Sequence, residues 1–163
     1  MSADKQFRVL LICTGNTCRT PIATGILKRL LEERKKTGIV VDSAGTSAYS
    51  GSPASELSEE VCRSFGIDIS AHSSKQLTAD LVHSSDLILV MTPQHYDYVV
   101  RLVPKSSDKT FLLKAFPNQR AGDKDYSIKD PIGGDREVYL KCYLDLDENL
   151  RRILPDILAK ANL

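Results

Sequence analysis

The chain has 163 residues, 42% of them hydrophobic, which is enough to bury the core of one domain without disulfide or metal support. Its 22 lysines and arginines nearly balance 21 acids, and the net charge of +1 argues against nucleic acid as a partner. The four cysteines lack paired C-x-x-C spacing and the three histidines are scattered, so we expect no metal and no cofactor. A polar start and the lack of a long apolar run predict a cytoplasmic protein without a membrane partner. We expect a single domain over residues 1–163, with about residues 1–6 flexible.

The first elements predicted are a strand and a helix joined by a polar turn. Residues 7–12, FRVLLI, form an apolar run typical of a strand buried on both faces. The polar turn covers residues 13–20. From Pro21, apolar residues recur every four positions, which predicts a helix with Thr20 as its cap and Gly38 as its end.

Strands and helices continue to alternate along the chain. A second strand is expected at 39–41 and a helix at 55–65. The apolar run at 86–91 predicts another buried strand, followed by a helix at 93–102 and a short strand at 110–113.

A long polar loop with several glycines and prolines then precedes the last helix. That helix is expected from about Asp135, with a kink at Pro155. Alternating strands and helices predict an α/β domain, a three-layer sandwich with a four-stranded parallel sheet flanked by helices on both faces. Ligands of such sheets bind beyond the carboxyl ends of the strands.

The turn at 13–20, CTGNTCRT, lies where a buried strand meets a helix, and such a turn can bind an anion. Inward-pointing backbone N–H groups and the positive end of the helix can cradle a phosphate group. Arg19 can hold two phosphate oxygens at once and stabilise a transferring phosphoryl group. The other residues expected to bind phosphate or substrate here are Thr14, Gly15, Asn16, Thr17, Cys18 and Thr20.

Cys13 is the candidate nucleophile. The amides, the helix end and the Thr20 hydroxyl should all favour its thiolate, so the site that binds the anion also activates the thiol. A lone cysteine at a strand end is usually a small buried hydrophobe, but this one shares its turn with Arg19. A non-catalytic anion-binding module would need the same amides and no thiolate, and it stays open as an alternative.

The loop CTGNTCRT, followed by a proline and a helix, closely resembles the signature loop of the low-molecular-weight protein tyrosine phosphatases. DSAGT at 42–46, GID at 66–68 and the Asp130-Pro131 pair resemble later landmarks of that family, in the same order. The resemblance implies an enzyme that hydrolyses phosphorylated proteins through a cysteinyl-phosphate intermediate and releases inorganic phosphate.

The resemblance also suggests roles for residues outside the loop. Asp130 would protonate the leaving group, although an Asp-Pro pair taken alone is more often a turn. Asn16 and Ser43 would hydrogen-bond around the loop, and His72 would be structural. Tyr49 matches the wall of the cleft, whereas the sequence alone equally predicts an exposed loop tyrosine.

The remaining thiols separate this interpretation from a redox one. Cys18 could pair with Cys13 under peroxide, or it could simply be buried packing. Cys62 and Cys142 are expected in the core. No cysteine lies between those two to supply the thiol relay of the related arsenate reductases, so a redox enzyme of that kind is a weaker alternative.

Two positions bear on the phosphorylated residue. Thr17 matches the threonine of the bacterial protein arginine phosphatases, whereas many tyrosine-specific relatives have an aliphatic residue there. Ile132 follows Asp-Pro, where tyrosine phosphatases usually carry aromatic residues that pack on the substrate ring. We therefore expect phosphoarginine ahead of phosphotyrosine, with a phosphotyrosine-specific phosphatase as the alternative.

Overall fold

The computed structural model of the chain describes residues 5–163, so residues 1–4 of the segment expected to be flexible lie outside it. Four strands form one sheet in the order β2-β1-β3-β4, and every neighbouring pair is parallel. The strands are β1 Phe7–Cys13, β2 Ile39–Gly45, β3 Leu87–Val90 and β4 Thr110–Leu112. The four-stranded parallel sheet predicted from the sequence is confirmed.

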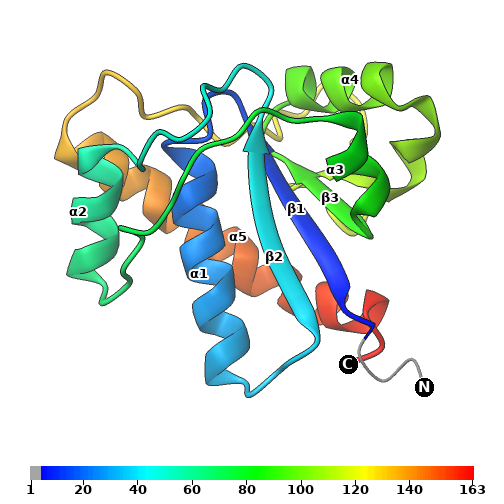
Figure 1. Cartoon of the computed structure of the whole chain (residues 1–163), viewed down its shortest axis with the longest axis horizontal. Helices are drawn as coiled ribbons and strands as arrows, with labels where there is room; N and C mark the ends of the chain where they lie inside the picture. Colours follow the sequence, from blue (N-terminus) through cyan, green and yellow to red (C-terminus); the bar gives the residue numbers. More distant parts are fainter. Residues whose placement is uncertain (1–4) are drawn as a thin grey trace.

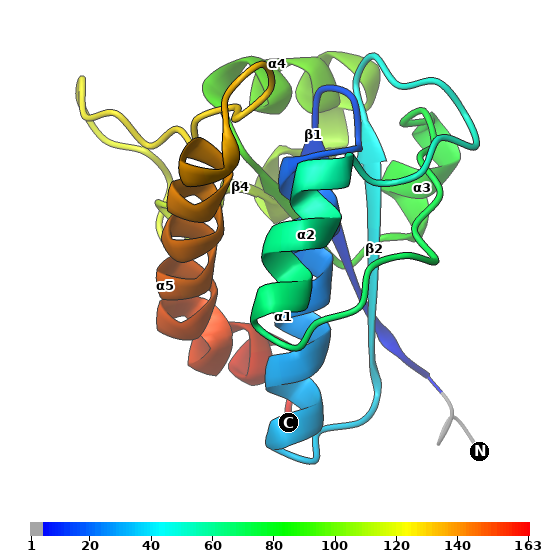
Figure 2. The ribbon, with the colours of Figure 1, turned by 90° about the vertical axis from the view of Figure 1, so that its left-hand side faces the viewer.

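Helices cover both faces of this sheet (Figure 1). The helices are α1 Arg19–Glu33, α2 Glu56–Ser64, α3 Ala79–Ser84, α4 Pro93–Leu102, the 3-10 helix η1 Pro104–Lys109 and α5 Arg136–Lys160. Helices α1, α2 and α5 lie on one face, and α3 and α4 lie on the other (Figure 2). The predicted three-layer architecture is therefore confirmed.

Alternate residues of the central strands supply the two halves of the core. Val9 and Leu11 of β1 pack in the cluster under α1, α2 and α5, whereas Leu10 and Ile12 pack in the cluster under α3 and α4. Because side chains alternate across a strand, a strand covered on both sides must be apolar at every position. This explains the continuous apolar run that marked β1 in the sequence.

Several boundaries differ from the sequence prediction. Helix α1 begins at Arg19 rather than Pro21 and ends at Glu33, while Gly38 lies in the following connection with φ +89° and its carbonyl accepts the Phe7 N–H at 2.8 Å. Helices α3 and η1 were not predicted. In Figure 2 the red end of α5 turns away from its orange part, which agrees with the kink expected at Pro155.

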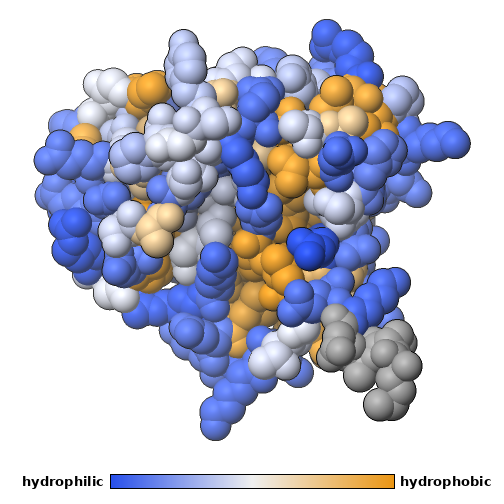
Figure 3. Space-filling view, in the orientation of Figure 1, coloured by the Kyte–Doolittle hydropathy of each residue, from blue (hydrophilic) through white to orange (hydrophobic). Residues whose placement is uncertain are grey.

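The carboxyl ends of β1, β2 and β3 point to one edge of the sheet, at the top of Figure 1. Cys13, Gly45 and Val90 end these three strands, so the segments that follow them meet there. On the face drawn in Figure 3, apolar residues gather around the edge strand β2, and polar residues surround them. Within residues 5–163, none of the helices is long and apolar enough to cross a bilayer.

Candidate active site

The connection from β1 to α1 forms a tight loop at this edge of the sheet. Cys13 is the last residue of β1 and is 2% exposed, and Arg19 is the first residue of α1. Cys18 takes the N-cap position, where no side chain among the described residues caps the helix. The Thr20 cap predicted from the sequence is therefore wrong, because the Thr20 hydroxyl is used inside the loop. The first amides of α1 are left without a side-chain acceptor, as an anion site requires.

The thiol of Cys13 is hydrogen-bonded within this loop. Its Sγ lies 3.1 Å from the Thr20 Oγ1, and the Asn16 Nδ2 donates to that same oxygen at 2.7 Å. Because the amide nitrogen can only donate, the Thr20 oxygen accepts from Asn16 and keeps its own hydrogen for the sulfur. The Thr20 hydroxyl is therefore directed at the Cys13 sulfur from inside the loop.

Asn16 is the structural centre of the loop. It is fully buried, and its φ of 58° lies in the left-handed region that asparagine tolerates. Its Nδ2 also donates to the Ser43 Oγ at 2.9 Å, and its Oδ1 accepts the Lys75 N–H at 2.9 Å. The His72 Nε2 donates to the Asn16 carbonyl at 2.6 Å. Ser43, Lys75 and His72 thus hold the curvature of the loop from outside it.

The segment at the end of β2 is hydrogen-bonded to the backbone of the loop. The N–H groups of Thr46 and Ser47 donate to the carbonyls of Cys13 and Thr14 at 3.0 and 2.9 Å. A Cβ on Gly45 would lie 2.3 Å from the Thr14 carbonyl oxygen, which is closer than side-chain atoms can come. Glycine is therefore required at this position by the close approach of the loop backbone.

Arg19 connects the loop to a distant segment. Its side chain is 4% exposed, its Nη1 donates to the Ile128 carbonyl at 3.0 Å, and its Nη2 lies 3.4 Å from the Asp130 Oδ2. Its buried Nε has no hydrogen-bond partner within residues 5–163. A buried N–H of this kind needs an acceptor, and an oxyanion in the loop would supply one.

Asp130 lies in the loop that leads to α5. Its Oδ1 accepts the Ile132 N–H at 3.1 Å, which is the turn expected of an Asp-Pro pair, while its Oδ2 faces Arg19. The buried Ile128 anchors this loop, because its N–H donates to the Met91 carbonyl just beyond β3 at 2.9 Å. Asp130 is 38% exposed, so it remains accessible from solvent beside the buried arginine.

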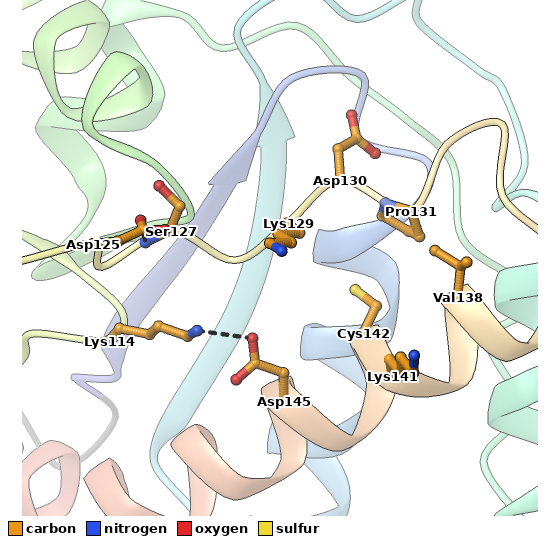
Figure 4. A pocket seen from close by; sticks show the side chains of 10 residues that line it. All are labelled: Lys114, Asp125, Ser127, Lys129, Asp130, Pro131, Val138, Lys141, Cys142 and Asp145. Atoms are coloured by element: carbon orange, nitrogen blue, oxygen red, sulfur yellow. Dashed lines mark hydrogen bonds and ion pairs between the residues drawn. The ribbon is translucent and has the colours of Figure 1, made fainter.

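A pocket of about 210 Å³ lies beside this loop, between it and α5 (Figure 4). Asp130 and Pro131 form part of its edge, and Cys142 and Asp145 of α5 form another wall. Lys114 reaches across it to pair with Asp145 at 3.0 Å. None of the residues 13–19 between β1 and α1 lines this pocket. The pocket is therefore separate from the loop that holds Cys13, which we call the anion loop.

The rim residues named from the sequence are exposed. Tyr49 is 85% exposed and Ile132 is 70% exposed, and the hydrogen bonds of the described residues connect neither side chain to the loop. Thr14 is exposed and Thr17 is half-buried. The Cys18 Sγ lies inside, 3.5 Å from the Tyr139 hydroxyl and 3.6 Å from the Ser55 Oγ.

Three contacts of the site were not foreseen. The His95 Nε2 lies 2.9 Å from the Thr14 Oγ1, the Ile128 carbonyl binds Arg19, and Tyr139 contacts Cys18. Each partner comes from a segment that is distant in sequence, and none belongs to a motif. One indication of these contacts was present in the sequence: His95 lies at the start of a predicted helix, just after a predicted strand.

Comparison with known proteins agrees with this geometry. A profile of the family "Low molecular weight phosphotyrosine protein phosphatase" matches residues 8–162. The chain belongs to this family. It is therefore a protein phosphatase, with a cysteine nucleophile as the family's chemistry.

Individual members of the low molecular weight family are similar over most of the chain. A protein-arginine-phosphatase of Geobacillus stearothermophilus is 40% identical over 90% of this chain and 93% of its own length. The probable low molecular weight protein-tyrosine-phosphatase AmsI of Erwinia amylovora is 37% identical over 83% of this chain and 86% of its own. A solved structure of the YwlE arginine phosphatase, a mutant with a phosphorylated active-site serine, has 30% identity and a TM-score of 0.84 over 93% of this chain and 95% of that one.

Proposed function

We propose that this phosphatase acts through a covalent intermediate on Cys13 and that it prefers phosphoarginine to phosphotyrosine in its protein substrates. The observation that carries the mechanism is the contact of Arg19 with both the Thr14 hydroxyl of the loop and Asp130. A nucleophile, an anion cradle and a proton donor then belong to one site. Residues 1–163 would work as one phosphatase domain in the cytoplasm, where reducing conditions keep the thiol usable.

In the first step, the Cys13 thiolate attacks phosphorus, and an S–P bond forms as the bond from phosphorus to the leaving nitrogen or oxygen breaks. Arg19 and the loop amides hold the phosphoryl oxygens while charge redistributes. Asp130 gives its proton to the leaving group. The other loop residues, which hold the cradle in shape, are Thr14, Gly15, Asn16, Thr17, Cys18 and Thr20.

In the second step, water attacks the phosphorus of the cysteinyl phosphate. The Asp130 carboxylate accepts the proton of that water, the S–P bond breaks, and inorganic phosphate leaves with the Cys13 thiolate regenerated. Ser43 and His72 act only through Asn16, by the hydrogen bonds that hold its side chain and carbonyl. No step needs a metal ion or an organic cofactor.

The preference for phosphoarginine rests on Thr17 and Ile132. Thr17 puts a half-buried hydroxyl into the loop, 3.9 Å from the Cys18 Sγ, where an aliphatic side chain would present only carbon. Ile132 is an exposed aliphatic residue after Asp-Pro, which leaves Tyr49 as the aromatic side chain proposed for the rim. The Thr17 hydroxyl can hydrogen-bond a polar guanidinium group, and Ile132 offers no aromatic ring to pack on a phenyl ring. The similarity to a protein-arginine-phosphatase supports the same preference.

The other two cysteines argue against a thiol relay. Cys62 and Cys142 are buried, and burial raises the pKa of each to about 12. Thiols of such high pKa are almost entirely protonated at neutral pH and are poor nucleophiles. Neither Cys62 nor Cys142 therefore supplies the second thiolate that an arsenate reductase-like cycle needs.

The test compares steady-state hydrolysis of phosphoarginine and phosphotyrosine peptides of one sequence, with and without EDTA. The native protein should be active in EDTA and should turn over the phosphoarginine peptide with the higher kcat/KM. Cys13→Ser should be inactive on both peptides, and Thr17→Val should shift the ratio toward phosphotyrosine by about tenfold. Far faster cleavage of phosphotyrosine by the native protein would contradict the proposed preference, while loss of activity in EDTA would contradict the mechanism.

A further inference from the structure

His95 occupies a defined position behind the loop. It is the third residue of α4 and is 4% exposed. Its backbone N–H donates to the Thr92 Oγ1 at 3.4 Å, and its ring Nδ1 accepts the Thr92 backbone N–H at 3.2 Å. These two bonds form a capping box, so the ring is fixed at the start of the helix.

The capping box determines which ring nitrogen carries the hydrogen. A backbone N–H can only donate, so the Nδ1 that faces Thr92 must be the acceptor. The neutral imidazole then has its hydrogen on Nε2. Burial, with the positive charge of Arg19 nearby, lowers the pKa of His95 to about 4, so the ring is neutral at pH 7.

The Nε2–H of His95 is directed at the catalytic loop. It lies 2.9 Å from the Thr14 Oγ1 and therefore donates to that oxygen. The Arg19 Nη2 donates to the same oxygen at 3.3 Å. A hydroxyl has two lone pairs and one hydrogen, so both acceptor sites of Thr14 are taken and its hydrogen remains for another partner.

Thr14 follows the nucleophile directly and is exposed at the mouth of the loop. A substrate phosphoryl oxygen, or the atom that links it to the leaving group, is an acceptor that would reach this mouth during turnover. We propose that His95 is a positioning residue, which fixes the Thr14 hydroxyl as a hydrogen-bond donor to the phosphorylated substrate and steadies the Nη2 edge of Arg19 through the same oxygen. This inference rests on the proposed function of Cys13.

The kinetic test is a double-mutant cycle between His95 and Thr14. His95→Asn keeps an acceptor for Thr92 but is too short to reach Thr14, and Thr14→Val removes the hydroxyl at constant shape. We expect each variant to lose about tenfold in kcat/KM on an aryl phosphate, and the double variant to be within about twofold of Thr14→Val. Losses that multiply to about a hundredfold would overturn the inference, since His95 would then act independently of Thr14.

Conservative variants separate positioning from a purely structural role. His95→Gln can present an amide N–H toward Thr14, and Thr14→Ser keeps the hydroxyl, so both should recover most of the lost activity. A purely structural role would lower the melting temperature of His95→Asn and leave the cycle additive. Because Thr14 is exposed, Thr14→Val should fold even where a His95 variant does not.

Nitrogen NMR of the His95 ring tests the same contact without any substrate. The native protein should show the Nε2–H tautomer with a slowly exchanging ring hydrogen, and Thr14→Val should speed that exchange at least tenfold. The Nδ1–H tautomer, or exchange unchanged by Thr14→Val, would overturn the inference even in an active enzyme. A native protein without Cys13-dependent turnover that still shows the slow Nε2–H would instead refute the proposed function alone.

Discussion

The Nη2 of Arg19 lies 3.4 Å from the Oδ2 of Asp130, although 111 positions separate the two residues in the chain. The contact joins the start of α1 to the loop before α5. The arginine is buried and the aspartate is partly exposed. Arg19 is therefore fixed against the loop residues 13–20, and Asp130 is accessible from solvent, as the proposed proton donor has to be.

Asp130→Asn should slow turnover in a way that depends on the leaving group. The asparagine keeps an oxygen for the Ile132 N–H and loses the transferable proton. We expect about a hundredfold or greater loss of kcat on a poorly leaving alkyl or guanidino phosphate, and less than tenfold on an aryl phosphate with a good leaving group. The matched control is Asp125→Asn, whose carboxylate accepts the Ser127 N–H in the same loop and should leave the rates unchanged. Equal losses across leaving groups would exclude Asp130 as the acid.

Cys13→Ser should separate binding from chemistry. The amides and Arg19 remain, so the variant should bind inorganic phosphate within about threefold of the native affinity, measured by calorimetry. Turnover should fall at least a thousandfold, because an unactivated serine hydroxyl is a poor nucleophile. Cys62→Ala, which removes a thiol from the core, is the control that should keep its turnover while losing stability. Retained activity in Cys13→Ser would rule out the cysteinyl phosphate.

Gly45→Ala should damage the loop more than the fold. A Cβ at this position would lie 2.3 Å from the Thr14 carbonyl oxygen, so the loop backbone must shift. We expect at least a tenfold loss of kcat/KM. Gly25→Ala is the control, because its Cβ would meet the Ile67 and Ile69 side chains at 2.8 and 2.9 Å, away from the loop. Gly25→Ala should lose stability in urea unfolding and keep its kcat. A Gly45→Ala variant that loses stability and keeps its kcat/KM would argue against the requirement for glycine at the end of β2.

The buried His95 should make stability depend on pH in the acid range. Its pKa is lowered from 6.5 to about 4, so the unfolded chain binds a proton that the folded chain does not between these values. The stabilisation is complete above pH 6.5 and is lost as pH falls toward 4, by about 3 kcal/mol in all. Between pH 7 and pH 5 the free energy of unfolding should fall by about 2 kcal/mol more in the native protein than in His95→Asn. Identical curves from urea titrations would show that the pKa of His95 is the same in the folded and unfolded states.

The sequence predicts the framework well wherever an element is long or fully buried. The strand at 7–12 and the helix over Pro93–Leu102 were found because core burial imposes apolar residues in a regular pattern. The short α3 was missed because it has six residues and buries only Val82 among them. The start of α1 was misplaced because Thr20 looks like a cap in the sequence, while in the fold its hydroxyl serves the nucleophile.

The residues of the site that are contiguous in sequence were likewise predictable, and those that come from distant segments were not. The anion loop is continuous in sequence, so its chemistry could be predicted from eight letters. His95 and Ile128 could not, because their contacts with Thr14 and Arg19 depend on β3 lying next to β1. That neighbour relation brings the segment after Met91 to the loop, and no local pattern encodes it.

The separation of Arg19 from Asp130 also sets an order of events on the ribosome. Arg19 of the loop is made early, whereas Asp130 is made 111 residues later, which corresponds to about 5 to 20 seconds of translation. The Arg19 side chain also takes its Ile128 contact from this late segment. A nascent chain thus contains the loop residues 13–20 well before Asp130, and the contact between Arg19 and Asp130 forms only after most of the chain has been translated.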